Sequence, residues 1–126
     1  IFLVPCCQRE VSNQLSNVKD TGFTPLIENY THRKILGSVL TDALRRLALE
    51  SFGYKVDIFE YVSVRRTEKN IMIRGVFGKV PSERSWSLLQ GTSHDLDLSL
   101  TLERILKEKG IHPPFNPPHG PAYSHP

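Results

Sequence analysis

The chain has 126 residues, which is the length of one domain or of part of one. Hydrophobic residues make up 39% of it, so its core is modest, and the formal net charge of +3 permits contact with nucleic acid without requiring it. Its apolar runs fall far short of the roughly 18 residues of a membrane span, and two cysteines are too few for a secreted disulfide scaffold.

The first predicted element is a short buried strand at residues 1–7, where four apolar residues precede Pro5, Cys6 and Cys7. Neighbouring strand residues point to opposite faces, so the two cysteines are poorly placed to bond each other, and we expect a reducing compartment inside the cell. The cysteines and the five histidines lack zinc-ligand spacing, so no metal site is predicted. Without a signal peptide or an initiator Met, we expect a processed product or a fragment.

The strongest helix prediction covers residues 31–52. Seven apolar residues recur there at the spacing of one buried helix face: Ile35, Leu36, Val39, Leu40, Ala43, Leu44 and Leu47. Thr31 is the predicted N-cap, Gly53 is predicted to end the helix, and Gly37 inside it indicates close packing. The preceding residues 8–30 are mixed and predict only one or two helical turns.

A β-hairpin is predicted next, with strands at 55–62 and 71–77 and the polar sequence "RRTEKN" between them. Both faces of its first strand carry apolar side chains, namely Val56, Ile58 and Val62 on one face and Phe59 and Tyr61 on the other. A strand that is apolar on both faces belongs to a covered sheet. We therefore expect further strands and helices, supplied from upstream of this chain, to complete the sheet.

The remaining sequence predicts a polar loop, a helix and a tail. Residues 78–93 form the predicted loop, residues 95–109 the helix, with Gly110 as its stop, and residues 112–126 a Pro-rich, disordered tail. The fold class is therefore α/β. The predicted parts of the chain are residues 1–77, a loop and C-terminal helix at 78–111, and the tail at 112–126.

Three stretches, in the same order, resemble one branch of the class I S-adenosylmethionine-dependent methyltransferases. They are "VPCCQRE" at 4–10, "RKILGSVLTDALRRLALESFGY" at 33–54 and "RRTEKNIMIRG" at 65–75. The resemblance covers residues 1–77 and is to the methyltransferase-like family with a Pro-Cys-Cys motif, which is related to the tRNA 2′-O-methyltransferases. It implies the C-terminal part of a Rossmann-like sheet, in which strand 5 leads into a long helix and antiparallel strand 7 inserts between strands 5 and 6.

The resemblance also implies S-adenosylmethionine as the cofactor of the complete enzyme. The family binds it at a glycine-rich turn after the first strand, and this chain has no G-x-G spacing followed by a helix. We therefore expect no cofactor binding by this chain alone. The expected partners are the missing N-terminal cofactor-binding half, on the same or another chain, and RNA or a ribonucleoprotein, with no membrane.

The substrate pocket is expected beyond the ends of the strands, where open α/β sheets bind ligands. Its candidate residues are Pro5, Cys6, Cys7, Gln8, Thr67, Lys69 and Asn70. The cysteines could line the pocket, could supply a nucleophile if a cation or helix terminus activated one, or could be small buried structural residues. The family's hairpin reads "EHTPKN", so Arg65, Arg66 and Glu68 are departures that change the chemistry of this loop.

Two further sets of residues are candidates for supporting roles. Thr41, Asp42 and Arg45 lie on a polar stripe of the long helix, either orienting the pocket segments or forming a solvated face. Residues 63–84 carry six basic side chains against two acidic ones, which suggests phosphate contact as an alternative to an ordinary solvated hairpin. The basic residues are Arg65, Arg66, Lys69, Arg74, Lys79 and Arg84. Trp86 could stack on a base, although a buried anchor is the plainer interpretation.

Two functions remain open from the sequence, besides the interpretation of the chain as an unrelated small α/β domain. The first is the C-terminal portion of a methyltransferase that acts on RNA or another macromolecule, active only when joined to its cofactor half. The second is a catalytically inactive, methyltransferase-like scaffold in an RNA–protein assembly such as a ribosome precursor.

Overall fold

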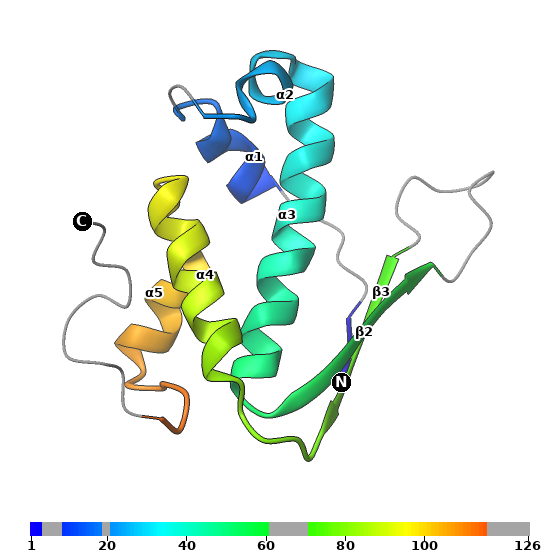
Figure 1. Ribbon diagram of the computed structural model, residues 1–126, viewed down its shortest axis with the longest axis vertical. Coiled ribbons are helices and arrows are strands. Elements are labelled where there is room, and N and C mark those ends of the chain that lie inside the picture. The colour runs from blue at the N-terminus through cyan, green and yellow to red at the C-terminus, as the bar shows by residue number, and fades with distance from the viewer. Residues whose placement is uncertain (4–8, 19–20, 61–70, 116–126) are drawn as a thin grey trace.

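The computed structural model describes residues 1–3, 9–18, 21–60 and 71–115. It is a mixed α/β structure with a small sheet on one side of a long central helix and shorter helices on the other (Figure 1). The elements, in chain order, are β1 (Phe2–Leu3), α1 (Arg9–Leu15), α2 (Thr24–Glu28), α3 (Tyr30–Ser51), β2 (Tyr54–Glu60), β3 (Ile71–Phe77), α4 (Glu83–Asp95) and α5 (Thr101–Glu108).

The described strands form one three-stranded sheet in the order β1-β3-β2, with β3 antiparallel to both neighbours. The two outer strands are therefore parallel to each other. Ile73 of β3 faces Leu3 on one side and Ile58 on the other, which fixes the register of the whole sheet. The hairpin prediction is confirmed within these bounds, while its residues 61 and 62 lie outside the described part of the chain.

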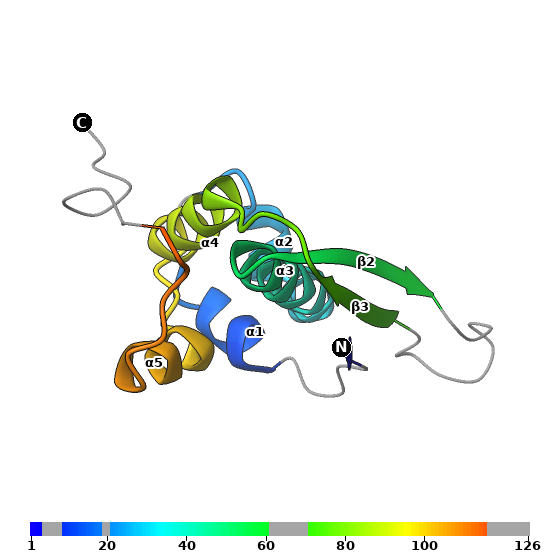
Figure 2. The same cartoon turned by 90° about the horizontal axis from the view of Figure 1, so that it is seen from below.

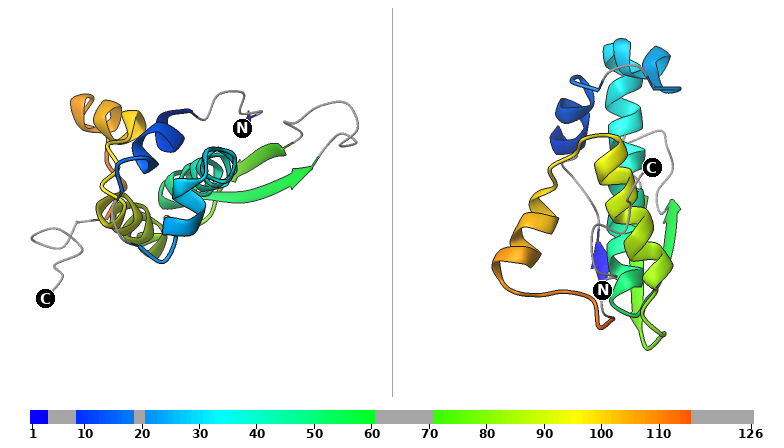
Figure 3. Two further views of the ribbon diagram at one scale, coloured as in Figure 1. Left: turned by 90° about the horizontal axis from the view of Figure 1, so that it is seen from above. Right: turned by 60° about the vertical axis from the view of Figure 1, so that its left-hand side comes forward.

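Helix α3 lies between the sheet and the remaining helices (Figure 2). Seen nearly end on, it has β2 and β3 on one side and α1, α4 and α5 on the other, and Figure 3 shows the same division from above. The main core lies on the helical side. Its buried members are Val11, Leu15, Leu44, Leu47, Ala48, Leu89, Leu98 and Leu100.

Three of the glycine and cap predictions for α3 can be compared with its structure. A Cβ added at Gly37 would lie 2.7 Å from the Cβ of Ser12, so the close packing predicted there is confirmed. Gly53 follows the helix end with φ of 93°, a conformation that favours glycine, as predicted. The predicted N-cap Thr31 is wrong, because Asn29 caps the helix and its side chain accepts a hydrogen bond from the amide of His32.

Part of the predicted buried face of α3 is also wrong. Leu44 and Leu47 are buried, and Leu36 and Leu40 pack against the core, as expected. However, the side chains of Ile35 and Val39 are 58% and 63% exposed. The helix is therefore buried along a narrower stripe than its seven apolar residues suggested.

The polar loop predicted at 78–93 is wrong, because residues 83–95 form helix α4. Ser82 caps it by accepting a hydrogen bond from the amide of Ser85 at 3.1 Å. Its buried residues are Ser85, Leu89, Gly91 and Ser93. Three of these four residues are small, and a search for a hydrophobic period misses buried positions of this kind.

The helix predicted at 95–109 begins six residues later, at Thr101, and ends just before Gly110 as predicted. The alternating leucines ahead of it belong to an extended segment in which Leu98 and Leu100 are buried in the core. The side chain of Gln14 in α1 holds this segment by accepting from the amide of Ser99 and donating to its carbonyl, at 2.6 and 3.0 Å. One oxygen of Glu10 accepts from the amide and hydroxyl of Thr101.

Candidate functional site

The sheet edge where β1 and β2 end is the place to which the sequence assigns a substrate pocket. Because these two strands are parallel, the chain leaves both of them at the same edge, after Leu3 and after Glu60. The segments that follow are 4–8 and 61–70. The candidates Pro5, Cys6, Cys7, Gln8, Arg65, Arg66, Thr67, Lys69 and Asn70 lie in them, outside the described residues.

The three candidate orienting residues of α3 are held by hydrogen bonds and by burial. The Thr41 hydroxyl donates to the carbonyl of Gly37 at 2.6 Å, within its own helix. Asp42 is 8% exposed, and one of its oxygens accepts from Arg45 at 3.3 Å. The alternative interpretation, a solvated helix face, therefore does not describe the buried Asp42.

Two of these residues share a cavity with the end of β1. Thr41, Arg45 and Leu3 line a mainly apolar cavity of about 510 Å³ between β1, α1, α3 and α5. Leu3 is the last described residue before segment 4–8, so Thr41 and Arg45 lie near the end of β1. The location of Thr41 and Arg45 agrees with a role in orienting the pocket segments, and that role remains a prediction.

The described basic candidates fall into two kinds. Arg74 donates to Asp57 at 2.7 Å across the paired strands, and this hydrogen bond lowers the pKa of the Asp57 carboxyl. Lys79 and Arg84 are exposed, and neither forms an ion pair within the part of the chain that the structure describes. Among these candidates, Lys79 and Arg84 are therefore available to meet a phosphate, while Arg74 already has a partner.

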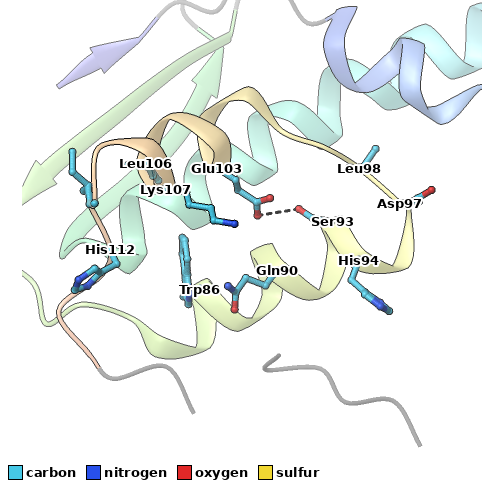
Figure 4. Close-up of a pocket in the computed structure, with 12 residues that line it drawn as sticks. Trp86, Gln90, Ser93, His94, Asp97, Leu98, Glu103, Leu106, Lys107 and His112 are labelled. Atoms are coloured by element: carbon cyan, nitrogen blue, oxygen red, sulfur yellow. Dashed lines mark hydrogen bonds between the residues drawn. The ribbon is translucent and has the colours of Figure 1, made fainter. Parts of the chain in front are cut away.

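A second cavity, which sequence reasoning did not find, lies between α4 and α5. It measures about 730 Å³, and we call it the α4–α5 cavity. Figure 4 shows Trp86 rising from α4 and Lys107 reaching from α5 toward the space between them, with Gln90 beside the indole. Glu103 and His112 also line it.

Glu103 is a half-buried carboxylate in this cavity, and its hydrogen bond with the rest of the chain is a long one. The hydroxyl of Ser93 lies 3.3 Å from it but donates to the carbonyl of Leu89 over a shorter distance, 2.9 Å, and a hydroxyl has only one proton. Burial raises the pKa of the Glu103 carboxyl, and the contact with Ser93 offsets only part of this. Within the described residues, Glu103 has no ion pair with a cation.

The signal for this cavity was present in the sequence only at Trp86. The tryptophan is partly buried and packs against the core, as the plainer interpretation held, yet its ring also lines the cavity. Glu103 lies on another helix, and no motif or spacing connects it to Trp86. Only the folding of α5 over α4 brings the two residues together.

Comparison of the chain with models of protein families, with characterised proteins and with solved structures gives no match. Among the described residues, no three side chains of His, Cys, Asp or Glu gather closely enough to hold a metal ion. Nor does any helix within those residues have the length and apolar character needed to cross a lipid bilayer.

Proposed function

We propose that this chain is the C-terminal part of a class I S-adenosylmethionine-dependent methyltransferase that acts on RNA or another macromolecule. The observation that carries the proposal is the strand order β1-β3-β2, in which an antiparallel strand lies between two parallel ones. The resemblance implies this same order for strands 5, 7 and 6. A small sheet built only from successive hairpins would place β2, not β3, beside β1.

The positions of the three matching sequence stretches give the proposal a second support. The first leaves the sheet after β1, the second forms α3, and the third begins after β2 and continues into β3. The ends of β1 and β2, which precede the first and third stretches in the chain, lie at the same sheet edge, and this is the edge where open α/β sheets bind ligands. Thr41 and Arg45 of the second stretch lie beside the end of β1.

The outer face of the sheet is a third support. This face carries the side chains that alternate with those directed at α3, namely Phe2, Lys55, Asp57, Phe59, Met72, Arg74 and Val76. Phe2 is 67% exposed and Val76 is 53% exposed. Large apolar side chains in this position fit a sheet that a further layer covers in the complete enzyme.

In such an enzyme, S-adenosylmethionine would supply the methyl group for a direct displacement whose rate depends on orientation. The chain lacks the family's glycine-rich cofactor turn, so its own contribution would be a wall of the substrate pocket. Residues 4–8 and 61–70 would form that wall, and the buried Asp42 and its partner Arg45 would help to hold it in position.

Isothermal titration of S-adenosylmethionine into the full-length protein that contains this chain tests the proposal, with the 126-residue chain as the control. We expect binding by the full-length protein and none by the control. If a well-folded full-length protein binds no cofactor, the proposal that it is a methyltransferase is wrong. Binding by the 126-residue control would contradict the expectation that the cofactor site lies outside this chain.

A catalytically inactive scaffold in an RNA–protein assembly is the second candidate. The exposed cations Lys79 and Arg84, together with the arginines that replace the family's acidic residue and histidine at 65 and 66, favour it. The same titration separates the two functions. A folded protein that binds RNA with strong salt dependence, but binds no cofactor, would be the scaffold.

A further inference from the structure

The α4–α5 cavity combines an aromatic wall, an incompletely bonded carboxylate and a cation. Trp86 provides a flat apolar surface, Glu103 provides acceptor oxygens, and Lys107 provides a positive charge (Figure 4). Cavities of this size are typical of small-molecule and nucleotide sites, which are mostly apolar with a few convergent polar groups. The question is which ligand would use all three groups at once.

The carboxylate requires a ligand that donates hydrogen bonds. Glu103 is half-buried, shares at most a weak contact with the Ser93 hydroxyl and has no cation partner among the described residues. Half-burial of a carboxylate removes part of its hydration, and hydrogen bonds from a ligand would offset that cost. A ligand that offered only acceptors to Glu103 would be repelled.

The aromatic wall and the cation narrow the choice further. An organic cation would satisfy Glu103 and stack on Trp86, but it would meet the like charge of Lys107. A nucleotide has a planar base for Trp86 and a phosphate for Lys107, so it uses both groups. Among the bases, guanine presents two adjacent donors, N1–H and the 2-amino group, which match the two oxygens of one carboxylate.

Gln90 fits the same base. Its amide lines the cavity beside Trp86 and makes no hydrogen bond within the described residues, so its NH₂ group is available to the O6 acceptor of guanine. Adenine would place its N1 acceptor against the carboxylate and offers only its 6-amino group as a donor at that edge. Guanine therefore completes the hydrogen bonds that this cavity leaves open.

We propose that the α4–α5 cavity binds an unpaired guanine nucleotide, stacked on Trp86, bonded at its Watson–Crick edge to Glu103 and approached at its phosphate by Lys107. The site would serve single-stranded RNA, whose bases are free to leave the stack. This inference requires neither methyl transfer nor the sheet edge.

Fluorescence quenching tests the site directly because Trp86 is the chain's single tryptophan. The 126-residue chain is titrated with guanosine 5′-monophosphate, with adenosine 5′-monophosphate and with methylguanidinium as the cation probe. We expect saturable quenching by the guanine nucleotide and at least about tenfold weaker binding of the adenine nucleotide. Equal binding of both nucleotides, tighter binding of methylguanidinium, or no saturable quenching would overturn the proposal.

Two variants test the role of the carboxylate. Glu103→Gln keeps the side-chain shape, removes the charge and is expected to weaken guanine nucleotide binding about tenfold. Glu108→Gln is the matched control, because Glu108 lies on the same helix but is exposed and paired with Arg104 at 2.9 Å. An equal loss of nucleotide affinity in both variants would indicate a general effect of charge and would contradict a specific role of Glu103 in binding.

A third variant tests stacking. Trp86→Leu, followed by isothermal titration because the fluorophore is lost, is expected to weaken binding about tenfold as well. Unchanged affinity in a folded Trp86→Leu protein would exclude stacking. If that variant fails to fold, the comparison of nucleotides on the unaltered chain still decides the proposal.

Discussion

The helical side of the molecule and the sheet side differ in how they treat their apolar residues. Leu15 and Leu89 on the helical side are completely buried, whereas Phe2 and Val76 on the outer face of the sheet are more than half exposed. The helices thus complete a core with one another. The sheet buries Ile73 against α3 and leaves its second face open. Apolar character in a strand can therefore indicate a layer that the described residues do not supply.

The comparison predicts that stability depends mainly on the helical side. Leu89→Ala, which removes a fully buried side chain of α4, is expected to lower the free energy of unfolding by about 2–5 kcal/mol. Urea unfolding followed by circular dichroism measures this. A loss below about 1 kcal/mol would mean that α4 is not part of the main core.

Close packing between α1 and α3 gives a somewhat smaller expected effect. A Cβ at residue 37 would lie 2.7 to 2.9 Å from atoms of Ser12, including its backbone, so Gly37→Ala forces α1 to shift. We expect a loss of about 1–3 kcal/mol in the same urea experiment. Gly22→Ala is the control, since nothing lies within 4 Å of its added Cβ, and it should be close to neutral. A neutral Gly37→Ala would contradict the packing.

The α4–α5 cavity is expected to reduce stability slightly through Glu103, in a pH-dependent manner. The pKa of this carboxyl in the folded chain is above its ordinary value of 4.5, so the folded state binds more protons between the two values. Stability from this group therefore falls as the pH rises through that window. Above this pH range, Glu103→Gln should have a higher melting temperature than the unaltered chain. Below this pH range, the difference in melting temperature should disappear.

The outer face of the sheet should give the smallest effect. Val76→Thr replaces an exposed side chain with another β-branched one, and we expect a change within about 0.5 kcal/mol. Thermal unfolding of the 126-residue chain measures this. If Val76→Thr instead lowered the free energy of unfolding of the full-length protein by well more than about 0.5 kcal/mol, a further layer would cover this face in the full-length protein.

The sequence predicted the elements whose burial is expressed as apolar periodicity. Helix α3 and the hairpin were found because Leu36, Leu40, Leu44 and Leu47 recur at helical spacing and the strands are rich in β-branched residues. Helix α4 was missed because it packs through Ser85, Gly91 and Ser93, whose small side chains carry no hydrophobic period.

Prediction of the sites had a different limit. The polar stripe was placed correctly on α3 because helical spacing alone brings Thr41, Asp42 and Arg45 together. The α4–α5 cavity depends on how two helices meet, and its residues Trp86 and Glu103 come from separate elements. No local sequence pattern predicts how these two helices pack against each other. The extended segment with Leu98 and Leu100 connects the two helices, and the sequence predicted helix there instead.

The bonds from Glu10 and Gln14 to residues 99–101 have a consequence for the order of folding. They join positions 85 and 91 residues apart, whereas the bonds within α3 and the pairing of β2 with β3 join residues much closer in sequence. Closing a long loop costs more chain entropy, so we expect α5 to dock after the rest has formed. Helix α5 contributes no fully buried residue of its own. It should also be the first helix to detach, opening one wall of the cavity while the core persists, and its amides should exchange with solvent ahead of those in α3.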